Sequence, residues 1–155
     1  EGHLDQSLFA REILSEKNGP PPEINLFNEK NNGETILRLI DQKFIKSAHD
    51  VSLGGIVTAL SKMCIKGKKG VTLKKPNYLI NEFEYLFGED QGRYIIEISK
   101  DDLKNVTKIL KDNSVHFDDL GMVNEGDLII NDKTKVSIDD LIKSHTTWLT
   151  NYISN

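Results

Sequence analysis

Apolar and polar positions alternate along the chain with the periods of several helices and strands. Apolar residues spaced three or four positions apart predict helices, and short runs rich in β-branched and aromatic residues predict strands. The predicted helices span residues 5–17, 25–41, 55–65, 77 or 81 to 87, 101–111 and 139 or 140 to 152. The predicted strands span residues 44–48, 71–73, 93–98, 115–123, 127–130 and 135–138. This alternation predicts an α/β (α+β) fold of three layers, in which helices flank a mixed β-sheet.

Cap and turn residues set the expected ends of these elements. Asp5 and Asn25 are the predicted N-caps of the first two helices, because their side-chain oxygens can accept from free backbone N–H groups. The run GPPP at residues 19–22 cannot continue a helix, and NNG at residues 31–33 is expected to weaken the middle of the second one. The run NEG at residues 124–126 predicts a hairpin that pairs the two strands on either side of it.

Length and composition place the chain among ordinary globular domains. Its 155 residues fit one domain, and 37% of them are apolar. The formal charge of −4 argues against nucleic-acid binding, which needs a basic surface. No run is long and apolar enough to span a membrane and no signal peptide is recognisable, so a cytoplasmic location is expected. The chain begins with Glu1 and not Met, so we expect that it was cut from a longer protein.

The single cysteine, Cys64, excludes an intramolecular disulfide. It lies in the apolar run ALSKMCI, with no basic group or helix N-terminus nearby in sequence to lower its pKa. We therefore predict a buried, unreactive thiol.

The first candidate site is the stretch HDVSLGG from His49 to Gly55, where a strand leads through two glycines into a helix. The first N–H groups of a helix lack internal partners, and glycine lets a ligand approach the backbone closely, so this pattern is typical of anion sites. His49, Asp50, Ser52, Gly54 and Gly55 are the candidate residues. The alternative is structural: Ser52 caps the helix, the glycines permit close packing, and His49 has only a structural role.

The second candidate is FGEDQGR at residues 87–93, between a helix and a strand. Glu89, Asp90, Gln91 and Arg93 would form a polar rim at one end of the sheet. The alternative is a surface turn with a weak Glu89–Arg93 ion pair.

No other pattern indicates catalytic chemistry. The four histidines, His3, His49, His116 and His145, do not have metal-ligand spacing, and neither a phosphate-binding loop of the Walker type nor a nucleophile elbow is present. We therefore predict no catalytic residue and no metal ligand in this chain.

Several motifs in one order resemble the C-terminal domain of phosphoribosylformylglycinamidine synthase, a member of the aminoimidazole ribonucleotide synthetase superfamily. HDVSLGG is similar to that domain's HDVSDGG, and FGEDQGRY at residues 87–94 is the same as its FGEDQGRY. The opening HLDQSLFAREI at residues 3–13 resembles HLGQSLYLREI. Further matches lie at residues 20–22, 29–33, 137–141 and 148–149, so the resemblance covers essentially the whole chain. In two departures, Leu53 replaces a usual acid and Asp5 a usual glycine.

The resemblance implies a role within a larger enzyme. The family's synthase uses ATP and Mg²⁺ to activate formylglycinamide ribonucleotide, and ammonia from a glutaminase subunit then gives the amidine in purine biosynthesis. The catalytic histidines and most nucleotide and Mg²⁺ ligands of the family lie in preceding domains, so only the two stretches above carry over, as rim or support residues. Cofactors are therefore expected in the full-length enzyme and none in this fragment.

The resulting hypothesis is a single C-terminal domain, residues 1–155, of a longer synthase chain. Its first 20 residues would pack on the preceding domain, its partners would be the preceding domains, the glutaminase subunit and a small accessory subunit, and alone it would be inactive. Two alternatives stay open. The chain is the equivalent domain of another ATP-dependent ligase or kinase of the superfamily, or it is a non-catalytic module that binds an anion or serves as a scaffold.

Overall fold

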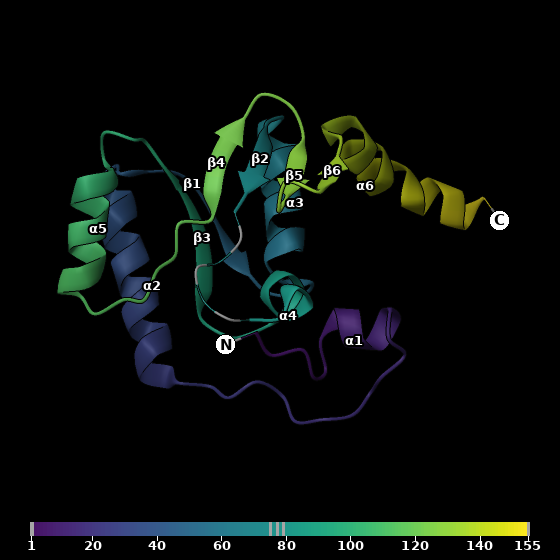
Figure 1. Cartoon of the computed structure of the whole chain (residues 1–155), viewed down its shortest axis with the longest axis horizontal. Helices are drawn as coiled ribbons and strands as arrows, with labels where there is room; N and C mark the ends of the chain where they lie inside the picture. Colours follow the sequence, from purple (N-terminus) through teal and green to yellow (C-terminus); the bar gives the residue numbers. More distant parts are fainter. Residues whose placement is uncertain (1, 75, 77, 79, 155) are drawn as a thin grey trace. The chain divides into compact units, whose positions relative to one another are not determined.

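The computed structural model describes residues 2–74, 76, 78 and 80–154, in which helices and strands alternate along the chain (Figure 1). The chain divides into two compact units. The first contains residues 1–59 and 79–118, and the second contains residues 60–78 and 119–155. Sheets flanked by helices confirm the predicted mixed α/β class, although the strands are divided between two sheets.

The first unit contains a two-stranded antiparallel sheet of β1 (Ile45–Val51) and β3 (Arg93–Ile98). Ile45 pairs with Ile98 at one end and Val51 with Arg93 at the other. Antiparallel pairing therefore places the residues that follow β1 beside the residues that precede β3. Those residues are the two candidate stretches, so this register brings them together.

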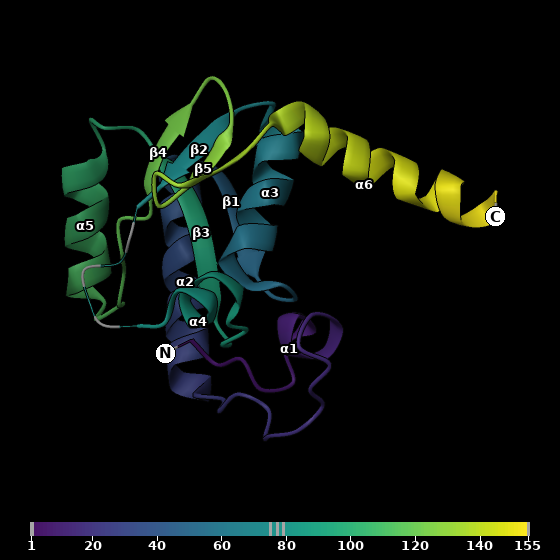
Figure 2. The same cartoon turned by 45° about the vertical axis from the view of Figure 1, so that its right-hand side comes forward.

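Two helices, α2 (Leu26–Asp41) and α5 (Leu103–Asp112), lie side by side next to this sheet (Figures 1 and 2). Leu39, Val106 and Leu110 form the buried centre between them. Partly buried side chains from the strands and loops pack around it: Phe44, Ile45, Ile96, Ile98, Ile109 and Val115. The spacing of Val106 and Leu110, four residues apart, is the helical stripe that the sequence predicted.

The first helix is much shorter than predicted. The helix α1 covers only Leu8–Glu12, and its N-cap is Ser7, whose hydroxyl accepts from the N–H of Ala10 at 3.1 Å. Asp5 is therefore not the cap, because Gln6 has φ of 61° and interrupts the helical path. Ser15, with φ of 59°, keeps the helix from extending toward residue 17.

The second helix begins where predicted and is continuous. Asn25 is its N-cap and accepts from the N–H of Asn28 at 3.0 Å. The run NNG does not interrupt it, because tertiary hydrogen bonds hold its asparagines. Asn31 donates to the carbonyl of Asn113 at 2.8 Å, and Asn32 donates to that of Gly92 at 3.0 Å.

The helix α4 (Glu82–Phe87) also belongs to the first unit. Asn81 is its N-cap, one of the two predicted starts, and forms a capping box with Glu84. The other predicted start, Asn77, lies outside the described residues. Phe9 of α1 stacks on Phe83 and Phe87 of α4, with ring centroids 5.4 and 4.5 Å apart. This stack fixes α1 against α4.

The second unit contains a four-stranded mixed sheet in the order β4-β2-β5-β6. The strands are β2 (Gly70–Leu73), β4 (Gly121–Asn124), β5 (Leu128–Ile130) and β6 (Thr134–Val136). The predicted hairpin between residues 115–123 and 127–130 is wrong, because β2 lies between β4 and β5 and pairs with both. The short connection at residues 125–127 crosses the start of β2, where a Cβ at Gly70 would collide with Asp127 and Asn124.

The hairpin of the second unit instead joins β5 and β6, which pair in antiparallel register. Its turn contains Asn131 and Asp132, both in the left-handed region with φ of 51° and 55°. Two consecutive left-handed residues suit the twist of a short hairpin, and Asn and Asp tolerate this conformation best after glycine. The sequence therefore contained a hairpin signal at this position that the NEG pattern obscured.

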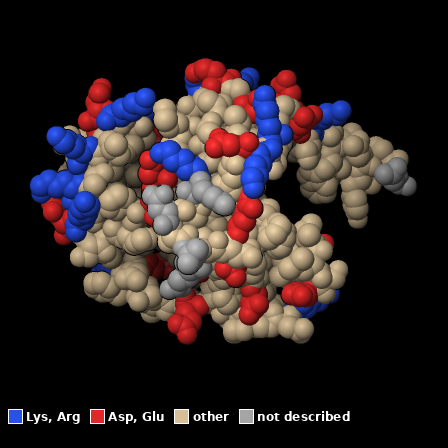
Figure 3. All heavy atoms as spheres, viewed as in Figure 1, with Lys and Arg blue, Asp and Glu red and all other residues tan. Residues whose placement is uncertain are grey.

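The first part of α3 (Gly55–Gly67) belongs to the first unit and the rest to the second, which also includes α6 (Ile138–Ile153). The N-cap of α6 is Ser137 and not Asp139 or Asp140. No residue of α6 is buried, and Trp148, Leu149, Tyr152 and Ile153 are mostly exposed. Its outer end shows neither basic nor acidic side chains in Figure 3.

Candidate functional site

The turn between β1 and α3 requires both of its glycines. β1 ends at Val51, α3 begins at Gly55, and the N–H of Gly55 donates to the carbonyl of Ser52 at 3.0 Å. Gly54 and Gly55 have φ of 82° and 66°, which other residues adopt at a cost. A Cβ at Gly55 would lie 2.7 Å from the carbonyl oxygen of Leu86 and from the backbone of Phe87. The expected strand–turn–helix is therefore confirmed, and Gly55 packs directly on the backbone at the end of α4.

The second candidate stretch meets the first through Glu89. Its Oε1 accepts from the N–H of Gly54 at 2.8 Å and from the N–H of Leu8, the first residue of α1, also at 2.8 Å. These N–H groups lie at helix starts, where donors lack partners inside the helix. A carboxylate of the protein itself therefore holds the position at which the sequence pattern suggested an external anion.

Asp90 anchors the N-terminal segment. Its carboxylate accepts from the N–H of Gly2 at 2.9 Å and from the N–H of His3 at 3.2 Å. The guanidinium of Arg93 lies 3.5 Å from Asp90 and donates to the carbonyls of Gly88 and Asp90. Arg93 therefore pairs with Asp90, where the surface-turn interpretation had expected Glu89.

Opposing effects act on the pKa of Asp90. Burial alone would raise it, but the hydrogen bond from Gly2, the charge of Arg93 and the hydrogen bond from His3 together lower the pKa below its ordinary value. A carboxylate with a depressed pKa contributes stability that is present above the pKa of the unfolded state, about 3.9, and is lost as the pH falls through the folded-state pKa.

We expect Asp90→Asn to destabilise the protein by about 1.5–3 kcal/mol at pH 7, the usual cost of losing hydrogen bonds to a charged group. The difference from wild type should shrink as the pH falls from about 4 toward the folded-state pKa, because the carboxyl takes up its proton first in the unfolded wild-type chain and only at lower pH in the folded protein. Urea denaturation of both proteins between pH 7 and pH 3 measures this difference. A difference that does not depend on pH would contradict the assigned role of the charge.

The remaining candidates lie near the surface. The Nδ1 atom of His49 is 3.3 Å from Asp50 Oδ1 and also contacts the carbonyl of Asp50. Asp50, Ser52 and Gln91 are exposed. His49 and Asp50 therefore form a local pair next to the glycine turn, while Ser52 takes part in the turn through its backbone carbonyl.

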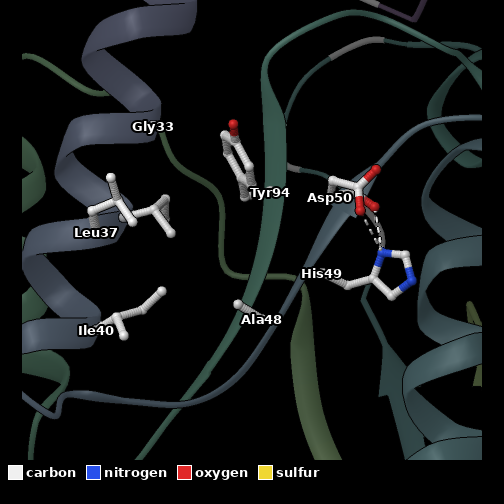
Figure 4. A pocket seen from close by; sticks show the side chains of 8 residues that line it. Gly33, Leu37, Ile40, Ala48, His49, Asp50 and Tyr94 are labelled. Carbon is white, nitrogen blue, oxygen red and sulfur yellow. Dashed lines mark hydrogen bonds and ion pairs between the residues drawn. The ribbon is translucent and has the colours of Figure 1, made fainter.

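An open groove of about 490 Å³ lies between α2 and the two strands of the first unit. Leu37 and Ile40 of α2 face Ala48 of β1 and Tyr94 of β3 across it (Figure 4). Gly33, Ile36, His49 and Asp50 also line the groove, and the last two contact each other. Sequence reasoning missed this groove. The available signal was the apolar face of α2, of which Leu37 and Ile40 remain 62% and 45% exposed.

Two further kinds of site concern the single cysteine and the metal-ligand residue types in the described part of the chain. Cys64 is buried as predicted, and desolvation raises the pKa of its thiol. Within residues 2–74, 76, 78 and 80–154, no group of three or more His, Cys, Asp and Glu side chains could hold a metal ion. The described helices also include none with the length and hydropathy needed to cross a membrane.

Comparison with known families shows to which family the chain belongs. The family model "AIR synthase related protein, C-terminal domain" matches residues 6–133. The chain belongs to this family. The match includes the glycine turn and the 87–93 loop, so both stretches are part of the AIR synthase related C-terminal domain, whereas α6 lies beyond the match.

Curated relatives from this family are synthase subunits. The chain is 86% identical over all 155 residues to phosphoribosylformylglycinamidine synthase subunit PurL of Pelagibacter ubique, and covers 21% of that protein. It is 37% identical over 153 residues, 99% of its length, to the PurL of Bartonella bacilliformis, again covering 21% of the relative. The chain therefore spans about a fifth of the length of the curated relatives it matches.

Solved structures share the fold. PurL of Thermotoga maritima in complex with FGAR matches with a TM-score of 0.73 at 22% identity, over 86% of this chain and 24% of that one. The same protein in complex with ATP matches with a TM-score of 0.63 at 22% identity, over 73% of this chain and 21% of that one. At 22% identity, this similarity shows that the chain and the matched part of PurL share a fold.

Proposed function

We propose that this chain is the C-terminal domain of a phosphoribosylformylglycinamidine synthase of the PurL type and acts as part of that enzyme. The observation that carries the proposal is the 86% identity to a PurL subunit over the whole chain. The chain spans only a fifth of that relative, so the activity belongs to a larger protein of which this domain is one part.

The proposed reaction converts formylglycinamide ribonucleotide, ATP and ammonia to formylglycinamidine ribonucleotide, ADP and phosphate. An amide oxygen is a poor leaving group, so it first takes the terminal phosphoryl group of ATP. Ammonia then attacks the activated carbon, and the oxygen departs with the phosphate. In the family that the chain resembles, most ligands of ATP and Mg²⁺ lie in the preceding domains, and we propose the same arrangement for this synthase.

Within that enzyme, the proposed role of the two stretches is support. His49, Asp50, Ser52, Gly54 and Gly55 would shape one edge of the anion and nucleotide site. The second stretch would form the polar rim of that site and hold the first stretch in place. Its residues are Glu89, Asp90, Gln91 and Arg93. The contacts of Glu89 and Asp90 with backbone N–H groups favour support over direct contact with substrate.

The proposed assembly follows from the same relationship. Residues 1–155 would form a single C-terminal domain whose first 20 residues pack on the preceding domains. The glutaminase subunit and the small accessory subunit would be its partners in the complex, in the cytoplasm. A structure of PurLQS from Thermotoga maritima is among those that share this fold, at 21% identity and a TM-score of 0.65.

The two alternatives have less support. No observation favours a different ligase or kinase of the superfamily. A non-catalytic anion-binding module would need free N–H groups at the glycine turn, and Glu89 already accepts from Gly54 there.

We expect the 155-residue chain to show no turnover by itself and the full-length synthase that contains it to be active. The physical reason is that the chain spans only about a fifth of the related synthase, so most of the enzyme that would hold the metal–nucleotide complex is missing. Phosphate release with ATP, Mg²⁺, formylglycinamide ribonucleotide and ammonia measures both proteins, and omission of the ribonucleotide is the control. Turnover by the chain alone would overturn the assignment as a fragment, and an inactive full-length protein would overturn the proposed reaction.

A further inference from the structure

A single carboxylate oxygen connects two segments that are far apart in sequence. Oε1 of Glu89 accepts from the N–H of Leu8 and from the N–H of Gly54, at 2.8 Å in both cases. Glu89 is half-buried, in the loop between α4 and β3. Each donor is a backbone group near the start of a helix, so each depends on a partner outside its own helix.

The same loop holds the N-terminal segment at two further points. The N–H of Glu89 donates to the carbonyl of His3 at 2.9 Å, and the carboxylate of Asp90 accepts from the N–H groups of Gly2 and His3. Gly88 also packs closely on Gly2, because a Cβ at Gly88 would lie 2.8 Å from the Gly2 Cα. The segment 2–8 is therefore bound to the loop at both of its ends, through Gly2 and His3 and through Leu8.

The glycine turn depends on this loop for its position. Gly54 and Gly55 are both left-handed, and glycine adopts many other conformations as readily, so contacts from outside the turn are needed to fix it. The surroundings of Gly55 are the backbone of Leu86 and Phe87, just before the loop. The N–H of Gly54 is held by Glu89, the residue that also binds the first residue of α1.

We propose that Glu89 is a positioning residue, whose carboxylate fixes the glycine turn to the N-terminal segment so that the placement of one depends on the other. This inference rests on the proposed function in one respect: the N-terminal segment is the part expected to follow the preceding domains of the synthase. Glu89 then sets the glycine turn relative to those domains without touching substrate itself.

Leu8→Pro tests this coupling at one atom. Leu8 is the first residue of α1, where proline fits a helix and its missing N–H is not used within the helix. Ser7 before it is extended, with ψ of 160°, which suits a residue that precedes proline. The substitution therefore removes the bond to Glu89 and leaves the bond from Gly54 to Glu89 in place. Leu8→Ala keeps the N–H and is the matched control.

The readout is hydrogen exchange of the Gly54 amide in the full-length synthase, resolved with overlapping peptides. Glu89→Ala should raise its exchange rate roughly tenfold or more, and Leu8→Pro should raise it roughly threefold or more, as expected for the loss of hydrogen bonds to a charged group. Leu8→Ala should leave it at the wild-type rate. An unchanged Gly54 rate in Leu8→Pro overturns the coupling.

Kinetics separate positioning from added stability. Glu89→Gln keeps an acceptor oxygen and should restore both Gly54 protection and activity, whereas Glu89→Ala should lower kcat/KM roughly tenfold well below its unfolding temperature. Wild-type kinetics in Glu89→Ala under those conditions would overturn the positioning role. If the wild-type synthase lacked the proposed activity, the exchange experiment would still decide whether Glu89 couples the two segments.

Discussion

Replacement of Gly55 by valine is expected to lower the free energy of unfolding by about 3–5 kcal/mol. The left-handed backbone, with φ of 66°, is a strained conformation for a β-branched residue. The new side chain would also press on the backbone of Leu86 and Phe87, which is 2.7 Å from the position of its Cβ. Backbone cannot rotate away as a flexible side chain can, so the turn and the end of α4 must separate. Urea denaturation of the chain measures the loss.

Gly67→Val is the matched control, because Gly67 is the last residue of the same helix, α3. A Cβ there meets nothing within 4 Å. We expect a change within about 0.5 kcal/mol of wild type, as for other surface substitutions. Equal destabilisation by the two valines would show that close packing at Gly55 is not what the glycine provides.

Leu39→Ala is expected to destabilise the chain by about 3–4 kcal/mol. Leu39 is fully buried between α2 and α5 against Val106 and Leu110, so truncation removes apolar contacts and leaves a cavity. Thermal or urea unfolding of the variant measures this cost. Recovery of the loss in a variant that refills the cavity from a neighbouring position would support the same account.

Leu37 lies on the same helix as Leu39, and Leu37→Ala removes the same side-chain atoms as Leu39→Ala. Leu37, however, is 62% exposed and lines the groove. Its effect on stability should stay within about 0.5 kcal/mol. A loss as large as that of Leu39→Ala would mean that the groove is closed in solution and that Leu37 belongs to the core.

Elements whose ends are set by local chemistry were predictable from the sequence. The strand β3 has the predicted bounds, and α2 and α4 begin after predicted caps, Asn25 and Asn81, because an Asn side chain can satisfy a free N–H at a helix start by itself. The first helix was predicted too long because apolar spacing continues to Leu14, while the left-handed backbone of Gln6 and Ser15 has no sequence signature.

Strand pairing was not predictable in the same way. The pattern around residues 124–126 describes a turn correctly, and Asn124 does accept from the N–H of Gly126 at 2.8 Å. It could not reveal that β2, some fifty residues earlier in the chain, lies between the strands on either side of the turn. Gly70 was the one local sign of this, since a glycine at the start of a strand permits close approach of another backbone.

The residues of the candidate site could be selected from the sequence, but the contacts between them could not be predicted. The sequence pattern selected both stretches, and their proximity follows from the pairing of β1 with β3. The bond from Gly54 to Glu89 and the bonds from Gly2 and His3 to Asp90 were not foreseeable, because a carboxylate that binds backbone N–H groups leaves no complementary side chain in the sequence.

The two compact units are interleaved along the chain, since residues 60–78 of the second separate residues 1–59 and 79–118 of the first. No single cut can therefore release either unit intact, and a C-terminal truncation before residue 119 removes β4, β5 and β6, the three strands that accompany β2 in its sheet. During synthesis on the ribosome, β2 cannot pair with β4 and β5 until residues 79–118 of the first unit have been made. Functional regions of this domain should accordingly be mapped with point substitutions and not with deletions. Chimaeras with relatives should exchange the whole domain.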